Sequence, residues 1–267
     1  MDGTTALLLV FLAGLATCLA TGLGALPFFF VDELAARTTV ALWAVAAGIM
    51  SAASVFGLVF EGLVWGTPAE LGVGLLIGAG VVVAGQRLLA GRDFSPEQYE
   101  AADFRTLVLV LGVLTVHSFP EGVAVGVAFA ELGLVEGVDP VGLGFGVPVL
   151  AVFMTAAIGI QNVPEGVAVS IPLHDMGASR AKMVWWAVFS SLPQPIAAVV
   201  AFRFVRAAET LLPVGFGFAA GAMLYLVVDE LIPEARERGA SLPDGGTRAL
   251  VAGFVGGVGI MVPLLFV

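Results

Sequence analysis

The feature that most constrains this chain is a short pattern that occurs twice, each time inside an apolar stretch. Residues 117–122 read His-Ser-Phe-Pro-Glu-Gly, and residues 161–166 read Gln-Asn-Val-Pro-Glu-Gly. Each copy lies near the middle of an apolar stretch of about 25 residues, which is long enough to cross a bilayer as a helix. An ionisable side chain at that depth costs about 2.5 to 3.5 kcal/mol, so its presence indicates a functional site. The pattern therefore predicts a membrane protein with polar residues between two of its helices.

The spacing within each copy places its polar residues on one helix face. His117 and Glu121 are four residues apart, as are Gln161 and Glu165, and residues at this spacing lie one above the other on a helix. If the two helices face each other, an imidazole, an amide and two carboxylates converge. Imidazole and carboxylate groups together suit zinc and other divalent first-row metals. We therefore predict a metal site between these helices.

The proline and glycine of each copy fit the same interpretation. Pro120 and Pro164 have no N–H, so a carbonyl group one turn earlier loses its helical partner and is free to meet water or an ion. Gly122 and Gly166 allow helices to approach closely. Proline kinks alone are common in membrane helices and also fit a packed core. The duplicated glutamate, with His or Gln one turn earlier, favours the functional interpretation.

The composition is that of a polytopic membrane protein. Of the 267 residues, 59% are hydrophobic and 12% are charged, and the mean hydropathy is +1.05. We expect an all-α integral membrane protein, a bundle of eight transmembrane helices that forms a single domain over residues 1–267. The predicted spans are about 5–30, 39–60, 71–90, 106–130, 146–172, 183–206, 211–233 and 248–267.

The distribution of charge predicts the orientation of the chain. Of the 11 Lys and Arg residues, all but Arg203 and Arg206 follow the odd-numbered spans. Because basic residues collect on the cytoplasmic side, both termini are predicted to lie outside the plasma membrane. The net charge of −10 fits either a surface that attracts cations or a salt-adapted acidic surface, and we favour the second.

Further polar or soft residues lie inside or close to the spans. Met50 in span 2 and Met223 in span 7 follow similar Ala- and Gly-rich segments, and such echoes fit the internal inverted repeats of transporters. Asp229 and Glu230, near the cytoplasmic end of span 7, are either interfacial charges or an exit station for a cation. Gln194 lies between two prolines of span 6, where we expect a kink and a side chain that faces protein.

These motifs resemble the ZIP (Zrt/Irt-like protein) family of divalent metal transporters, in particular its prokaryotic GufA-like branch. The resemblance covers essentially the whole chain and rests on residues 24–27, 117–122, 161–166, 217–223 and 232–234. It implies a protein that is not an enzyme and that carries Zn²⁺ into the cytoplasm through a site between spans 4 and 5. Cd²⁺, Fe²⁺ and Mn²⁺ are the alternative substrates.

The resemblance also implies which residues bind the metal. A primary site would use His117, Glu121, Gln161 and Glu165, with Met50 as a soft ligand from span 2. The family also has a second metal site next to the primary one, which a neighbouring set of residues would form.

That adjacent second site would use Ser118, Asn162 and Gln194, with the two glutamates as bridges. The family pattern has Asn at position 118 and Glu at position 194. Because a neutral amide offers no charge to a second dication, we expect one tightly held metal rather than two.

Three other functions are weighed against transport of a transition metal. A cation exchanger of the sodium/calcium type also carries paired Pro-Glu motifs, but its oxygen-rich sites suit Ca²⁺, and His117 and Met50 argue against it. An intramembrane metalloprotease needs His-Glu-x-x-His on a helix, and the other histidine, His174, is expected in a loop. A structural protein or receptor gives no reason for four polar groups within the membrane. The expected partners are a divalent metal ion and the lipid bilayer, with no nucleic acid, and a homodimer is left open.

Overall fold

The computed structural model describes residues 3–31, 34–89, 117–132, 146–175 and 177–263. Within these ranges the chain is helical and contains no β-strand, which confirms the predicted all-α class. Six helical segments of the described chain are long and apolar enough to cross a bilayer. A shorter apolar helix corresponds to the last predicted span, and only residues 117–128 of the fourth span are described as helix.

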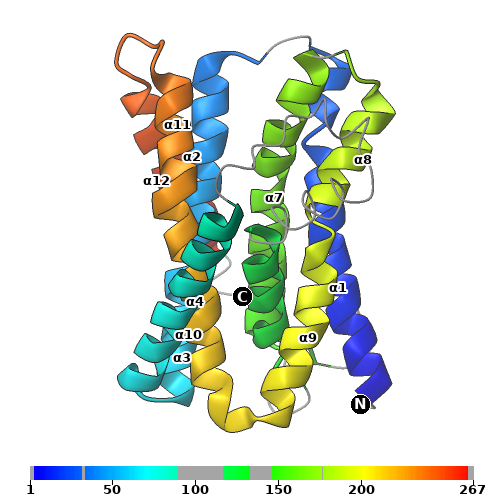
Figure 1. Ribbon diagram of the computed structural model, residues 1–267, viewed down its shortest axis with the longest axis vertical. Coiled ribbons are helices and arrows are strands. Elements are labelled where there is room, and N and C mark those ends of the chain that lie inside the picture. The colour runs from blue at the N-terminus through cyan, green and yellow to red at the C-terminus, as the bar shows by residue number, and fades with distance from the viewer. Residues whose placement is uncertain (1–2, 32–33, 90–116, 133–145, 176, 264–267) are drawn as a thin grey trace.

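The helices form two groups that stand side by side (Figure 1). The first, called here the α1/α7 bundle, contains helix 117–128 and the elements α1 (Gly3–Leu23), α7 (Val149–Asp175), α8 (Arg180–Ser190) and α9 (Pro193–Ala207). The second, called the α2/α10 bundle, contains α2 (Ala36–Ala52), α3 (Phe60–Trp65), α4 (Pro68–Leu89), α10 (Leu212–Leu226), α11 (Ile232–Gly239) and α12 (Thr247–Met261).

Glycines bring the helix backbones into direct contact within each bundle. A Cβ atom added to Gly78 of α4 would lie 2.0 Å from the carbonyl oxygen of Phe218 in α10. A Cβ atom added to Gly166 of α7 would lie 1.8 Å from the carbonyl oxygen of Thr21 in α1. Membrane helices associate through such close packing because lipid tails are as apolar as the side chains.

Six of the predicted spans correspond to long apolar helical segments of the described residues, with different boundaries. Span 2 is longer than expected, because α2 continues through a π-helical segment, Ala53–Val59, into α3. Span 7 likewise continues from α10 through a π-helical segment, Val227–Leu231, into α11. These two segments follow Met50 and Met223, the residues of the sequence echo, and π-helical turns often occur at functional positions. Residues 106–116 of span 4 lie outside the described residues.

Two local expectations are tested by the described residues. The kink predicted in span 6 is a break, because α8 ends at Ser190 and α9 begins at Pro193. His174, expected in a loop, lies instead in the last turn of α7, where its ring centroid is 5.2 Å from that of Phe28. Helix α7 is extended by apolar residues that pack against α1 and the short helix Leu26–Phe29, so it ends later than predicted.

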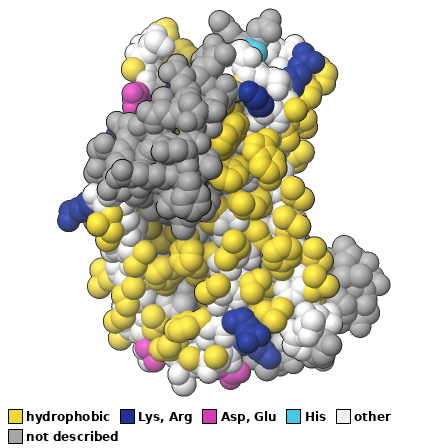
Figure 2. All heavy atoms as spheres, turned by 45° about the vertical axis from the view of Figure 1, so that its right-hand side comes forward, with side chains coloured by type: hydrophobic (Ala, Val, Ile, Leu, Met, Phe, Trp, Pro, Cys, Tyr) yellow, Lys and Arg dark blue, Asp and Glu magenta, His cyan; other side chains and the backbone are white. Residues whose placement is uncertain are grey.

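The surface fits insertion into a membrane. On the face seen in Figure 2, hydrophobic side chains cover the middle of the molecule, and most charged side chains lie towards its two ends. The many exposed large hydrophobic residues include Leu76, Val64 and Phe30, which are 77%, 77% and 88% exposed. Such a surface is unfavourable in water and favourable in lipid, so the chain is an integral membrane protein.

Candidate metal site

The two copies of the repeated motif face each other, as the sequence predicts. The side-chain amide nitrogen of Gln161, in α7, donates a hydrogen bond of 2.6 Å to Oε1 of Glu121, in helix 117–128. The same nitrogen lies 3.5 Å from Oε1 of Glu165, one turn further along α7. One amide group therefore joins the two glutamates, at a position where Glu121 and Gln161 are only 2% and 0% exposed.

The orientation of the Gln161 amide leaves an oxygen atom free. Its nitrogen is used by the carboxylates, and its buried oxygen, Oε1, has no hydrogen-bond partner. A buried polar atom without a partner is costly unless a ligand or water satisfies it. With the two carboxylates beside it, this oxygen belongs to a donor set that suits a divalent cation.

A cavity of about 170 Å³ adjoins these residues. Its lining contains Met50, His117, Ser118, Glu121, Glu165 and Glu230, together with Trp43, Ala168, Val169, Ser190, Leu226 and Leu231. The lining residues of α7 follow Glu165, so the cavity extends from the motif towards the end of the molecule where α8 begins and α11 lies (Figure 1).

Span 7 contributes Glu230 to this cavity. The sequence leaves open whether Asp229 and Glu230 are interfacial charges or part of a metal path. The imidazole Nε2 of His117 lies 2.6 Å from Oε2 of Glu230, and both side chains are 36% exposed. This is a close histidine–carboxylate pair rather than a well-aligned hydrogen bond, because Oε2 accepts none of suitable geometry. Asp229 is exposed and interacts with Tyr225 instead. The structure thus brings Glu230, and not Asp229, to the site.

The residues expected at a second site are engaged with one another and with the backbone. The hydroxyl group of Ser118 donates to the carbonyl oxygen of Ser190, at 2.8 Å. Asn162 donates from Nδ2 to Oε1 of Gln194, at 3.0 Å, and to the carbonyl oxygen of Thr17, at 2.8 Å. Thr17 was not predicted as a functional residue, because its span carries none of the repeated polar pattern.

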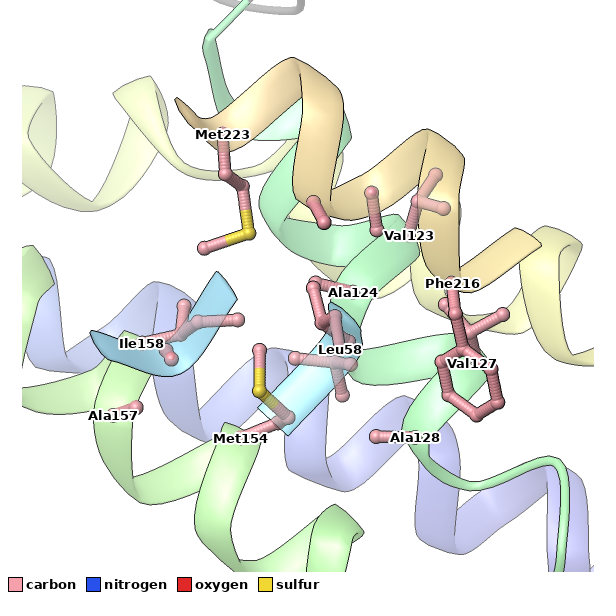
Figure 3. Close-up of a cluster of buried hydrophobic side chains, with 14 of the residues drawn as sticks. Leu58, Val123, Ala124, Val127, Ala128, Met154, Ala157, Ile158, Phe216 and Met223 are labelled. Atoms are coloured by element: carbon pink, nitrogen blue, oxygen red, sulfur yellow. The ribbon is translucent and has the colours of Figure 1, made fainter. Parts of the chain in front are cut away.

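On the other side of the motif the interior is apolar. Figure 3 shows Leu58, Met154, Ile158 and Met223 directed towards one another in a cluster. Of the residues labelled in Figure 3, those of α7 (Met154, Ala157, Ile158) precede Gln161, and those of helix 117–128 (Val123, Ala124, Val127, Ala128) follow Glu121. The cluster therefore separates the motif from the end of the molecule where α9 meets α10, and the cavity lies on the opposite side.

Within the described part of the chain, no three His, Cys, Asp or Glu side chains are gathered closely enough to hold an ion by themselves. Glu121 and Glu165 are joined through Gln161, whereas His117 is paired with Glu230. A metal ion would therefore also use the free amide oxygen of Gln161 or the thioether of Met50, or would draw His117 away from Glu230.

The fold and the site together define a polytopic helical membrane protein with a buried polar site between two bundles. The family model described as "ZIP Zinc transporter" matches residues 140–265. The zinc transporter GufA of Myxococcus xanthus is 31% identical over 251 residues, which cover 88% of this chain and 91% of GufA. The zinc transporter ZIPB of Bordetella bronchiseptica is 35% identical over 261 residues, which cover 91% of this chain and 77% of ZIPB. The chain belongs to the ZIP family and has bacterial GufA-like relatives.

A longer relative matches over only part of its length. A protein of Arabidopsis thaliana is 40% identical over 223 residues, which cover 83% of this chain but 33% of the plant protein. The chain thus spans about a third of the length of this relative.

Proposed function

We propose that this protein carries Zn²⁺, or a similar divalent metal ion, across the plasma membrane into the cytoplasm. The observation that carries the proposal is the convergence of Glu121, Gln161 and Glu165, with one unpartnered amide oxygen, beside a cavity that also contains His117 and Met50. The names of the relatives GufA and ZIPB, both zinc transporters, support the same substrate class.

The charges of the proposed site suit a single dication. Glu121 and Glu165 together supply two negative charges when ionised, which balance one divalent ion. A buried charge without a partner is strongly unfavourable, so an uncompensated second ion would be repelled. His117 and Met50 are softer ligands that favour Zn²⁺ or Cd²⁺ over Ca²⁺, which prefers oxygen ligands throughout.

The proposed path of the metal ion through the protein differs on the two sides of the motif. The apolar cluster of Leu58, Met154, Ile158 and Met223 closes the half nearer to the α9–α10 end. The cavity with Glu230 occupies the other half, and the predicted orientation places that half towards the cytoplasm. We propose that this arrangement is the inward-facing state. In this state Glu230 receives the metal ion as it leaves the site towards the cytoplasm.

Alternating access then requires the two bundles to move relative to each other. The site uses helix 117–128 and α7 from one bundle, while Met50 and Glu230 come from the other. In this proposal the chain has eight spans with internal inverted-repeat character and both termini outside, and its metal site lies near the middle of the bilayer.

Uptake by the purified full chain in liposomes tests the proposal. Zn²⁺, Cd²⁺ and Ca²⁺ are compared in wild type and in Glu165→Ala, with Glu237→Ala as a matched control because Glu237 is exposed on α11. We expect uptake of Zn²⁺ and Cd²⁺, its loss in Glu165→Ala, and no change in Glu237→Ala. Uptake of Ca²⁺ alone would favour the cation exchanger, and normal Zn²⁺ uptake by Glu165→Ala would refute the site.

A further inference from the structure

A hydrogen-bond network of neutral polar side chains reaches Glu121 from outside the cavity. Oε1 of Gln194, in α9, accepts hydrogen bonds from the hydroxyl group of Thr17 in α1, at 2.7 Å, and from Nδ2 of Asn162 in α7, at 3.0 Å. Nε2 of Gln194 donates to Oε2 of Glu121. Thr17, Asn162 and Gln194 are at most 1% exposed, and none of them lines the cavity.

The chemistry of the partners fixes the orientation of the Gln194 amide. An ionised carboxylate only accepts hydrogen bonds, so the NH₂ group of Gln194 must face Glu121. The NH₂ group of Asn162 then donates to the amide oxygen, and so does the hydroxyl group of Thr17, whose one hydrogen is shared with the carbonyl oxygen of Gly14 at 2.8 Å. Because an amide oxygen has two lone pairs, it has none left for a metal ion.

The Glu121 carboxylate is consequently held by an amide group on each of its oxygens. Gln161 of α7 donates to Oε1, and Gln194 of α9 donates to Oε2. Two donors on different helices fix the plane of the carboxylate, which also lies against the carboxyl group of Glu165.

We infer that Thr17, Asn162 and Gln194 are positioning residues, which orient the Glu121 carboxylate for the metal and do not themselves bind it. The inference rests on the proposed function. It assigns a role to Thr17 that no motif of the sequence carries, and it assigns Gln194 to a hydrogen-bond network instead of a second metal site. Hydrogen-bond partners of metal ligands of this kind typically contribute about 10- to 100-fold to metal affinity.

The test measures Zn²⁺ binding to the purified full chain by equilibrium dialysis. Thr17→Val removes the hydroxyl group at nearly constant volume, and Gln194→Met removes the amide group. Thr155→Val is the matched control, because among the described residues the Thr155 hydroxyl group bonds within α7, to the carbonyl oxygen of Ala151 at 2.7 Å. Thr17→Ser restores the hydroxyl group, and thermal unfolding of each variant separates weaker binding from weaker folding.

We expect the wild-type chain to bind one Zn²⁺. The variants Thr17→Val and Gln194→Met should also bind one Zn²⁺, with about tenfold weaker affinity. Thr17→Ser and Thr155→Val should bind as wild type does. Gln194→Glu should raise the stoichiometry towards two, since it places a third carboxylate beside Glu121.

The outcomes separate this inference from the proposed function. Wild-type affinity in both Thr17→Val and Gln194→Met, or Thr17→Ser binding as weakly as Thr17→Val, would overturn the positioning role and leave transport intact. Two Zn²⁺ ions per wild-type chain, both lost in Glu121→Ala, would overturn it as well. A wild-type protein that binds no Zn²⁺ would overturn the proposed function on which the inference rests.

Discussion

His117 and Glu230 meet across the boundary between the two bundles, with Nε2 of the histidine 2.6 Å from Oε2 of the glutamate. His117 begins the described part of span 4 in the α1/α7 bundle, and Glu230 lies in the π-helical segment of the α2/α10 bundle. Because the same imidazole is predicted as a metal ligand, we expect Glu230 and the metal to compete for it as the ion leaves the site.

Replacing Glu230 by Ala should lower the maximal rate of Zn²⁺ uptake several-fold and change the half-saturating concentration much less. The reason is that Glu230 lines the same cavity as Glu121 and Glu165 and, in the proposed direction of transport, receives the ion after them. Asp229→Ala is the control, since Asp229 is the neighbouring acid but is exposed and interacts with Tyr225. Initial rates over a range of Zn²⁺ concentrations decide the matter, and equal losses in both variants would contradict the role of Glu230.

Linking the two bundles at the α9–α10 end should stop transport. Nε1 of Trp65, in α3, donates to Oε1 of Glu131 at 2.6 Å, just beyond helix 117–128. A cysteine pair at Trp65 and Glu131, joined by a short bifunctional thiol reagent in a Cys18→Ala background, would hold the bundles together. We expect uptake to fall to background after linking and to be unaffected in the same variant before linking.

A second pair controls for linking within one bundle. Nη1 of Arg206, in α9, donates to the carbonyl oxygens of Ala130 and Leu132, each at 3.2 Å, so cysteines at 206 and 131 are separated by about the length of an arginine side chain, which a bifunctional thiol reagent can span. Linking this pair should leave uptake unchanged, because α9 and helix 117–128 move together in the proposed mechanism. Transport that survives the Trp65–Glu131 link would argue against relative motion of the bundles.

The predicted orientation can be tested at two exposed positions. Glu209 lies between α9 and α10, and Ser241 lies between α11 and α12, at opposite ends of the molecule. In a Cys18→Ala background, Glu209→Cys should react with an impermeant thiol reagent added to intact cells. Ser241→Cys should react only after the membrane is opened. The reverse pattern would invert the proposed direction of uptake.

Packing of α4 against α10 should depend on Gly78. An added Cβ atom there would lie 2.0 Å from the carbonyl oxygen of Phe218, whereas one added to Gly80 meets no atom within 4 Å. Gly78→Ala should therefore destabilise the fold by about 1–3 kcal/mol, as other overpacked sites do. Gly80→Ala, which exchanges glycine for a better helix former, should not lower stability. The thermal midpoints of the two purified variants in detergent provide the measurement.

The helical membrane class and the shared helix face of the polar residues within each motif follow from short-range properties of the chain. Apolar stretches of bilayer length predict spans, and the four-residue spacing of Gln161 and Glu165 predicts that both lie on one helix face. The contact of the Gln161 amide nitrogen with Oε1 of Glu165, at 3.5 Å, agrees with this prediction. The break before Gln194 is also local, since Pro193 and Pro195 each remove a backbone donor.

Other features were out of reach of such reasoning. Asp229 and Glu230 are neighbours, so they point about 100° apart on a helix, and a sequence pattern cannot tell which one faces the site. A π-helical segment shifts the rotation of the residues around it, and here it contains both acids. Only the packed structure shows Glu230 against His117.

The sequence by itself determined that this chain spans a membrane and that the polar residues of each motif share one helix face, because both follow from hydrophobic length and helical period. The tertiary structure alone decided that Gln194 is turned towards Glu121 and that Thr17, from a span without polar motifs, supports it. The physical reason is that a buried amide takes the orientation that satisfies all of its hydrogen bonds. Its partners come from helices far apart in the chain, and these meet only when the helices pack.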